Sequence, residues 1–347
     1  MVRVGVIGAS GYAGAELVRY LLMHPGVEIT YLASESLVGK PLSAAFPSFL
    51  GQRLPLCEDF DARTAADRAD IIFQTKKNGV GMSVAPEILG LGKRMIDVPA
   101  DFRLKDPALY KQYYKADHTA PGLLAEAVYG VPEFHASEIA SARIVANPGC
   151  YATSAILALA PLVTDGMADP GSIVIDSKSG VSGAGRSKAD TASIFTEINE
   201  GFRAYKVAAH AHTPEIEQEL SVLAGKPVTL SFTPHLIPMN RGILTTAYAN
   251  LSRTLSTDEL VERYKRFYED KPFVVVLDAG EQPNTKNVFG TNFCHIAAVS
   301  DRRTGRAIIT SAIDNMGKGA AGQAVQNMNL MCGYDESTGL MSPAVFP

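Results

Sequence analysis

The feature that most limits the possible folds of this chain is its N-terminal segment, where an apolar stretch, a glycine-rich loop and a helix-forming stretch follow one another directly. Residues 3–7 have the sequence RVGVI, residues 8–14 GASGYAG and residues 15–22 AELVRYLL. Glycines in such a loop let the backbone approach a pyrophosphate, and the N-terminus of the following helix supplies N–H donors to it. The order therefore predicts a dinucleotide-binding unit, although the spacing is GxxGxxG rather than GxGxxG and a plain tight turn is the alternative. The candidate cofactor-binding residues in this loop are Gly8, Ser10, Gly11, Tyr12, Ala13 and Gly14.

A second strand is expected at residues 27–32, and three polar side chains follow it. Where the second strand of a dinucleotide-binding sheet ends, side chains meet the adenosine ribose. Glu35 can accept a hydrogen bond from the 2′-hydroxyl of NAD, whereas Ser34 and Ser36 can donate to the 2′-phosphate of NADP. These residues do not decide between NAD and NADP, and Glu35 can equally be a solvated surface residue.

Strands and helices continue to alternate through the rest of this half. Further strands are expected at residues 69–74, 93–98 and 143–146, and a helix at 84–91. This alternation predicts an α/β fold with a parallel, doubly wound, Rossmann-type sheet. The loops at 75–79 and 99–103 follow strands of that sheet, so we expect them at its ligand-binding edge.

The segment Ala-Asn-Pro-Gly-Cys-Tyr at residues 146–151 joins a strand to a helix expected at 153–160. Asn-Pro-Gly is typical of a turn, because proline fixes φ and glycine tolerates dihedrals that other residues do not. Cys150 then lies at or near the first turn of the helix, where N–H groups and the helix dipole stabilise a thiolate and lower its pKa. This placement predicts a nucleophile; the alternative is a small buried hydrophobic residue, the usual state of a free cysteine.

Two further segments carry candidate functional side chains. A Ser/Gly-rich loop at 177–186 contains Lys178 and Arg186, and such a loop can surround a phosphate with backbone and side-chain donors, or be a flexible surface loop. Downstream, His210 and His212 precede a helix that Thr213 is expected to cap. Each histidine can be structural, and a metal pair lacks a third ligand at useful spacing. The third possibility is an acid/base partner for Cys150, which nucleophilic acyl chemistry requires.

The second half of the chain has a different pattern. Strands are expected at residues 172–176, 228–232, 243–249, 273–277, 294–299 and 307–313. One clear helix, at 257–268, separates the later strands, which predicts a second, α+β domain with a mixed, largely antiparallel sheet and helices on one face. A helix rich in small residues at 318–330 is expected to pack against the first domain. We therefore predict a dinucleotide-binding domain at 1–149 plus 315–347, and a second domain at 150–314.

Composition excludes several classes of protein. The 347 residues carry a formal net charge of −4 and no strong basic run, which disfavours nucleic-acid binding. The 4 cysteines are scattered, as expected in a reducing compartment, and suggest neither a disulfide framework nor a zinc site. The longest apolar run, 155–163, is too short to span a bilayer, and the chain opens directly into a strand without a signal peptide. We expect a soluble, cytoplasmic protein that binds neither membrane nor metal.

Taken together, these motifs resemble those of the N-acetyl-γ-glutamyl-phosphate reductases, a family of the semialdehyde dehydrogenase group. The matching segments span nearly the whole chain and are residues 8–14, 100–103, 147–151, 179–186, 212–219, 233–236, 241–242 and 318–329. The resemblance implies NADPH-dependent reduction of N-acetyl-γ-glutamyl phosphate to N-acetylglutamate semialdehyde in arginine biosynthesis, with NAD as a possible cofactor. It also implies that the domain at 1–149 plus 315–347 binds NADP, and that the domain at 150–314 is the catalytic and oligomerisation domain, whose sheet assembles a homodimer or homotetramer.

The resemblance also implies roles for individual residues. Cys150 attacks the acyl phosphate and forms a thioester, hydride from the nicotinamide reduces it, and His212 shuttles the proton as the thiohemiacetal collapses. Gly180 and Asn315 join the cofactor-binding residues. The substrate-binding candidates are Arg103, Asn147, Ser179, Ser182, Arg186, His210 and Arg241, of which Ser179, Ser182 and Arg186 hold the phosphate.

The chain departs from the usual family pattern mainly in loops expected to line the crevice. Thr-Lys-Lys-Asn-Gly at 75–79 stands where the family usually has a small residue, an apolar residue and then Leu-Pro-His-Gly, and Val-Pro at 98–99 replaces Leu-Ser. Ala211 stands in place of arginine, and Met-Gly at 316–317 in place of Leu-Val. Loss of the arginine weakens recognition of a substrate carboxylate, and two added lysines near the nicotinamide favour anionic groups. We therefore hypothesise a variant with an altered acyl-phosphate or cofactor preference, such as a smaller acyl phosphate.

Two other functions stay open on the sequence. A related semialdehyde dehydrogenase, for example one acting on aspartyl phosphate, is disfavoured by the motifs around His212 and in the C-terminal helix. A non-catalytic dinucleotide-sensing protein on the same fold gains some support from the altered loops.

Overall fold

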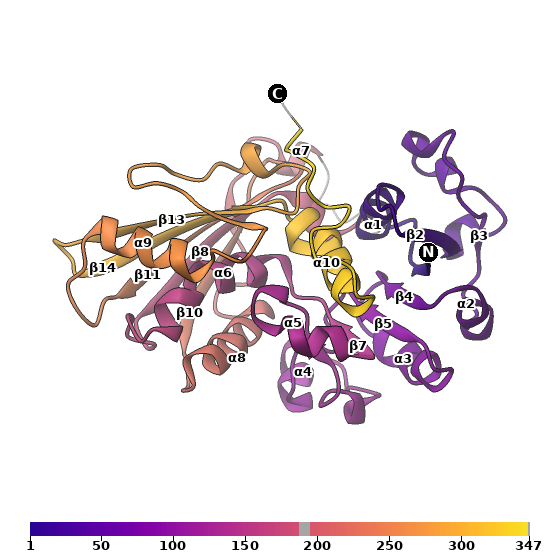
Figure 1. The fold of residues 1–347 in the computed structure, drawn as a ribbon, viewed down its shortest axis with the longest axis horizontal. Coiled ribbons are helices and arrows are strands. Elements are labelled where there is room, and N and C mark those ends of the chain that lie inside the picture. The colour runs from indigo at the N-terminus through magenta and orange to yellow at the C-terminus, as the bar shows by residue number, and fades with distance from the viewer. Residues whose placement is uncertain (187–194, 346–347) are drawn as a thin grey trace. The chain divides into compact units, whose positions relative to one another are not determined.

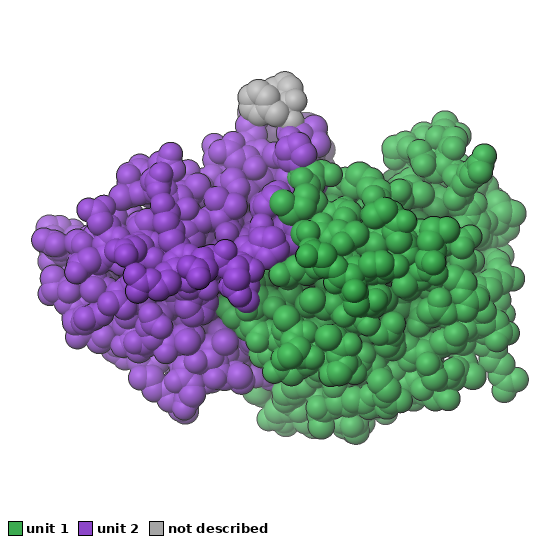
Figure 2. Space-filling model, in the orientation of Figure 1, with its two compact units in different colours: residues 1–149, 185–187, 320–342 green, residues 150–184, 188–319, 343–347 purple. Residues whose placement is uncertain are grey.

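The computed structural model describes residues 1–186 and 195–345, which form two compact units (Figure 2). The described parts of the first unit are residues 1–149, 185–186 and 320–342, and those of the second are 150–184, 195–319 and 343–345. The chain thus passes into the second unit between Gly149 and Cys150. The sequence predicts the return to the first domain at residue 315, whereas in the structure residues 315–319 belong to the second unit.

The first unit is built on a seven-stranded sheet in the order β3-β2-β1-β4-β5-β7-β6, in which every neighbouring pair is parallel. Its strands are β1 (Val2–Ile7), β2 (Val27–Ala33), β3 (Cys57–Glu58), β4 (Ile71–Gln74), β5 (Arg94–Asp97), β6 (Val128–Tyr129) and β7 (Ile144–Ala146). The predicted Rossmann-type sheet is confirmed. Strands β3 and β6 are too short to show an apolar pattern, so the sequence does not predict them.

Helices cover both faces of this sheet. They are α1 (Tyr12–Leu22), α2 (Ala62–Arg68), α3 (Val80–Gly90), α4 (Pro107–Tyr114), α5 (Pro132–Ser141) and α10 (Gly322–Met331). Helix α10 packs against α1 and α5, while α2 packs against α3. Short helices such as α2 and α4 begin at aspartate caps, Asp61 and Asp106, and carry too few large apolar residues to be predicted from periodicity.

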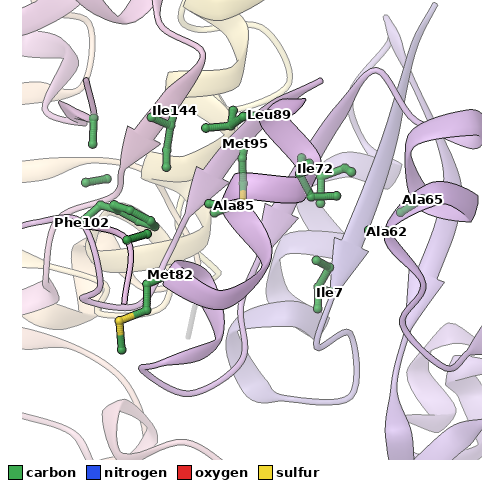
Figure 3. Packing of buried hydrophobic residues seen from close by; sticks show 14 of the residues in the cluster. Ile7, Ala62, Ala65, Ile72, Met82, Ala85, Leu89, Met95, Phe102 and Ile144 are labelled. Carbon is green, nitrogen blue, oxygen red and sulfur yellow. The ribbon is translucent and has the colours of Figure 1, made fainter. Parts of the chain in front are cut away.

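The core under α2 and α3 is shown in Figure 3. Ile72 and Met95 from the strands meet Ala85 and Leu89 from α3 and Ala65 from α2, all of them buried. Fully burying one large aliphatic side chain contributes about 1.5–3 kcal/mol. This packing fixes the strands whose carboxyl ends carry the loops described below.

The second unit contains a seven-stranded mixed sheet in the order β12-β13-β14-β11-β8-β10-β9. Its strands are β8 (Ile173–Ser179), β9 (Arg203–Ala204), β10 (Leu230–Leu236), β11 (Ile243–Asn250), β12 (Val274–Val276), β13 (Cys294–Asp301) and β14 (Arg306–Ile313). The pairs β8–β10 and β12–β13 are parallel and the other four pairs are antiparallel. This confirms the predicted mixed, largely antiparallel sheet.

The helices of the second unit are α6 (Cys150–Thr164), α7 (Phe195–Ile198), α8 (His212–Ala224) and α9 (Thr257–Phe267). Helix α6 contacts the sheet, α8 and α9, so these three helices share one face (Figure 1). Along β8 the side chains alternate: Ile173 and Ile175 are buried and Val174 is 41% exposed. Among residues 1–186 and 195–345, no helix combines the length and the apolar character that a membrane crossing requires.

Candidate active site

Cys150 is the first residue of helix α6, earlier than the predicted helix start at residue 153. Its side chain is partly exposed, while residues 151–163 behind it are buried. The thiol therefore lies at the N-terminal end of a helix held firmly in the second unit. A helix N-terminus favours the anionic form of a thiol, which is the nucleophilic form.

The turn before Cys150 is held by hydrogen bonds within the first unit. The backbone N–H of Asn147 donates to the carbonyl of Asp97 (2.8 Å), and its side-chain amide donates to the carbonyl of Ala320 (3.1 Å). Arg103 donates from Nε to the carbonyl of Asn147 (2.8 Å) and from Nη2 to that of Val98 (2.7 Å). Arg103 and Asn147, both predicted to bind substrate, are thus buried and contribute to the position of the turn.

A π-helical turn that begins at Gly317, in the same unit as Cys150, approaches the Cys150 backbone closely. A Cβ atom added to Gly319 would lie 2.8 Å from the Cβ of Cys150, so only glycine fits there. The start of this turn is held by the buried carboxylate of Asp314, which accepts hydrogen bonds from the N–H groups of Met316 (2.8 Å) and Gly317 (3.1 Å). The backbone carbonyl of Asp314 accepts a hydrogen bond from the N–H of Gly319 (3.0 Å).

Several predicted ligand-binding residues meet around Asp314 and Asn315. Arg241 forms an ion pair with Asp314 (Nη2–Oδ2 3.0 Å). Asn315 accepts a hydrogen bond from the N–H of Gly242 (2.7 Å) and donates to the hydroxyl of Ser182 (2.9 Å). These two hydrogen bonds connect Ser182 to the segment that follows Asp314. Asn315 is only 2% exposed, so its amide is buried between them. The resemblance implies that Asn315 binds the cofactor; in the structure its side-chain amide takes part in this hydrogen-bonded network of the second unit.

The remaining residues of the Ser/Gly loop are divided between the two units. A Cβ atom on Gly180 would lie 2.8 Å from the backbone of Asn240 and Arg241, and the buried Ser179 hydroxyl donates to the carbonyl of Gly180 (2.9 Å). Arg186 belongs with the first unit, where its Nη1 donates to the carbonyl of Ser10 (3.2 Å). Residues 187–194 lie outside the described part of the chain.

His212 is the first residue of helix α8. The prediction that Thr213 caps this helix is wrong, because the chain already turns at Ala211, which has helical dihedrals, and Thr213 falls inside the first turn. The ring of His212 lies 4.6 Å from that of His210 and 5.8 Å from that of Tyr151, the residue after Cys150. The first turn of α6 and the first turn of α8 therefore meet in the second unit.

A chain of hydrogen bonds supports the two histidines. Nδ1 of His210 accepts from the backbone N–H of His212 (3.1 Å), and Nε2 of His210 lies 3.5 Å from the hydroxyl of Tyr205. Tyr205 donates to the hydroxyl of Tyr151 (3.3 Å), which donates to the carbonyl of His235 (3.0 Å). The pattern fits a neutral His210 with its proton on Nε2.

Burial determines the protonation states in this cluster. Burial, and to a lesser degree the neighbouring His212, lowers the pKa of His210 to about 2. Burial also raises the pKa of Tyr205 to about 12, and the negative charge of the Cys150 thiolate acts in the same direction. Both groups therefore stay neutral near pH 7, and Cys150 and His212 remain the candidates of this cluster for a chemical role. The sequence does not single out Tyr205, because it follows a two-residue strand without a recognisable pattern.

The glycine-rich loop of the first unit has the geometry of a nucleotide cradle. Gly8 has φ +90, and its N–H and that of Ala9 donate to the carbonyl of Ala33 (2.9 and 3.1 Å). A Cβ atom on Gly14 would lie 2.3 Å from the carbonyl oxygen of Gly8, so α1 packs this closely only with glycine. Gly11 precedes α1, and no side chain caps the helix. These features fit a pyrophosphate held by backbone N–H groups.

Three hydroxyl groups lie next to this loop at the end of β2. The Ser10 hydroxyl is 2.7 Å from that of Ser34 and 3.3 Å from that of Ser36. Tyr12 and Ala13 begin α1, with Tyr12 exposed. The structure thus brings the predicted residues of the glycine loop and of the β2 end together in the first unit. Among the described residues, no group of His, Cys, Asp or Glu side chains is arranged to hold a metal ion.

Comparison with known proteins agrees with this arrangement. Residues 3–142 match the NAD-binding domain of the semialdehyde dehydrogenases, and residues 150–315 match their dimerisation domain. An N-acetyl-γ-glutamyl-phosphate reductase of Desulforudis audaxviator is 51% identical over 347 residues, and one of Pelotomaculum thermopropionicum is 52% identical over 346 residues; both alignments cover 100% of this chain and at least 99% of the relative. Among solved structures, aspartate semialdehyde dehydrogenase II of Vibrio cholerae has a TM-score of 0.74 at 18% identity, covering 96% of this chain and 98% of that one. The latter likeness concerns the fold.

Proposed function

This chain belongs to the N-acetyl-γ-glutamyl-phosphate reductases of the semialdehyde dehydrogenase family, and from that premise we propose that it reduces N-acetyl-γ-glutamyl phosphate to N-acetylglutamate semialdehyde with NADPH. The observation that carries the proposal is the meeting of the first turns of α6 and α8, which brings the Cys150 and His212 segments together in one unit. A nucleophile and an acid/base group are the two elements that acyl transfer through a covalent intermediate needs.

In this proposal the Cys150 thiolate attacks the acyl-phosphate carbonyl, phosphate leaves with the electrons of the broken C–O bond, and a thioester remains on sulfur. Bound NADPH supplies the hydride for the reduction of that thioester. His212 exchanges a proton with the oxygen of the resulting thiohemiacetal, which collapses to the aldehyde and returns the thiolate. Ser182 and Arg241, held by Asn315 and Asp314, are candidates for holding the substrate, with His210 placing His212.

The reverse reaction tests the proposal with a clear readout. Purified protein mixed with N-acetylglutamate semialdehyde and NADP should form NADPH only when inorganic phosphate is present. Cys150→Ser should abolish this turnover and keep the affinity for NADP, because Cys150 lies outside the unit with the glycine loop. NADP binding without turnover in the unaltered protein would contradict the proposal and favour a sensing role. Turnover of aspartate semialdehyde in preference to the N-acetylated substrate would assign it to the aspartyl-phosphate branch.

We further propose that the protein acts in the cytoplasm as a homodimer or homotetramer assembled through the second sheet. All 4 cysteines are free thiols, as in proteins of reducing compartments. The second unit matches a dimerisation domain, and the sheet face opposite α6, α8 and α9 is partly exposed, with Val174 on it. Light scattering after size exclusion should give two or four copies, and Val174→Asp should lower that number. A monomer at micromolar concentration would contradict this.

A further inference from the structure

The end of β2 carries a carboxylate that conflicts with the cofactor of the family. Glu35 stands directly after Ser34, in the position where an acidic side chain accepts the ribose 2′-hydroxyl of NAD. A lone carboxylate there repels the 2′-phosphate of NADP. A reductase that uses NADPH therefore requires something at this position that offsets the charge of Glu35.

Lys76 meets that requirement. It follows β4, and its ammonium group forms an ion pair with the carboxylate of Glu35. Its stem lies over the glycine-rich loop, since a Cβ atom on Gly8 would be 2.7 Å from Cγ of Lys76. The hydrogen bond from Lys76 is the largest cause of the lowered pKa of Glu35. The lysine thus crosses from the end of β4 over the glycine loop to the end of β2.

The surroundings of this ion pair suit a phosphate. The hydroxyl groups of Ser10, Ser34 and Ser36 lie within 2.7–3.4 Å of one another and can each donate to an anion. The Glu35 side chain is 72% exposed and that of Lys76 is 26% exposed, so the carboxylate can turn into solvent while the lysine stays. A lysine held near hydroxyl donors is a usual phosphate-binding arrangement.

We propose that Lys76 is the residue that selects NADPH over NADH, with its ammonium group exchanging Glu35 for the 2′-phosphate of the cofactor. Glu35 keeps the lysine extended over the glycine loop before the cofactor binds. This inference rests on the proposed cofactor site, and it changes the expectation that the lysines of the 75–79 loop act near the nicotinamide. The departure of this loop from the family pattern then concerns the adenosine end of the cofactor.

Binding of nucleotide fragments tests this without any turnover. Calorimetry should compare 2′,5′-ADP, which carries the 2′-phosphate, with 5′-AMP, which lacks it. Lys76→Gln should weaken 2′,5′-ADP binding about 10- to 100-fold, as expected for loss of a charged hydrogen bond, and change 5′-AMP binding less than about 2-fold. Lys76→Arg should keep most of the preference. Lys77→Gln, an exposed neighbour of equal charge, is the matched control and should change either affinity less than about 3-fold.

The results distinguish the role of Lys76 from the existence of the cofactor site. Glu35→Gln should strengthen 2′,5′-ADP binding, because the lysine then has no competing partner. Equal weakening of both fragments in Lys76→Gln, or no weakening, would overturn the role of Lys76 and leave the reductase assignment intact. Failure of the unaltered protein to bind either fragment would overturn the cofactor site as well.

Discussion

The region around Cys150 and the region around Ser10 differ in how deeply their polar groups are buried and how fully these groups are hydrogen-bonded. In the second unit, His210, Asp314 and Asn315 are buried, and each has its polar atoms engaged by neighbouring backbone or side chains. In the first unit, the Glu35–Lys76 pair is partly exposed and its bonds are replaceable. The difference indicates that the acyl-transfer groups are preorganised, while the cofactor-selecting groups rearrange around their ligand. Replacing a reacting group around Cys150 should therefore lower kcat most, and replacing a group around Ser10 should have a smaller effect, on cofactor affinity. A residue that only supports the reacting groups, such as His210, should have the smallest effect at neutral pH.

Among variants that keep Cys150, the largest effect is expected from His212→Gln, which keeps a polar side chain at the start of α8 and removes the proposed acid/base group. We expect kcat to fall about 10²- to 10⁴-fold, the usual worth of general acid–base catalysis. An unchanged kcat would show that another group moves the proton, and the melting temperature serves as the control for folding.

The next largest loss of kcat is expected from Gly319→Ala, because the added Cβ atom would lie 2.8 Å from the Cβ atom of Cys150. A displaced nucleophile of this kind lowers kcat on the order of 10²-fold. Gly90→Ala is the matched control, since a Cβ atom there meets nothing within 4 Å. Equal kinetics of the two variants would contradict a close-fitted Cys150.

At the cofactor edge, Ser34→Ala should weaken NADPH binding only about 2- to 10-fold, because one of three hydroxyl donors is lost and those of Ser10 and Ser36 persist. Titration of NADPH fluorescence measures this. A loss of affinity of more than 100-fold would show that the cofactor-binding groups are as preorganised as those around Cys150, and would contradict the difference between the two regions.

The smallest effect at neutral pH is expected from His210→Gln, which retains an acceptor for the N–H of His212. Burial lowers the folded-state pKa of His210 to about 2, below the unfolded value of about 6.5. Between these values the unfolded chain binds the extra proton, so the free energy of unfolding decreases as pH falls, by up to about 1.4 kcal/mol per pH unit. Urea unfolding from pH 7 to pH 4 should show a flatter decline in the variant; parallel curves would contradict a neutral, buried His210.

The sequence predicts the parts of the fold that have strong local patterns. The glycine loop at 8–14 and the long apolar strands give the Rossmann-type sheet, and the change of pattern after Cys150 gives the mixed sheet. Two-residue strands such as β3 and alanine-rich helices such as α2 are fixed by tertiary packing, so no local pattern predicts them.

The site shows the same limit. Cys150 and His212 can be named as candidates because each lies near an expected helix start, and the resemblance to a known family then assigns their roles. The side-chain partners cannot, since Lys76 and Glu35 are far apart in sequence and meet only through the parallel register of β2, β1 and β4. For the same reason, the sequence does not show that Arg241 pairs with Asp314.

The most direct test of the central claim is the intact mass of the protein after mixing with N-acetylglutamyl phosphate in the absence of NADPH. The account predicts one N-acetylglutamyl group per chain, located on Cys150 by peptide mapping and released as the aldehyde when NADPH is added. An adduct that persists in Cys150→Ser, or reduction by NADPH with no adduct in the unaltered protein, would contradict a thioester formed at the start of helix α6.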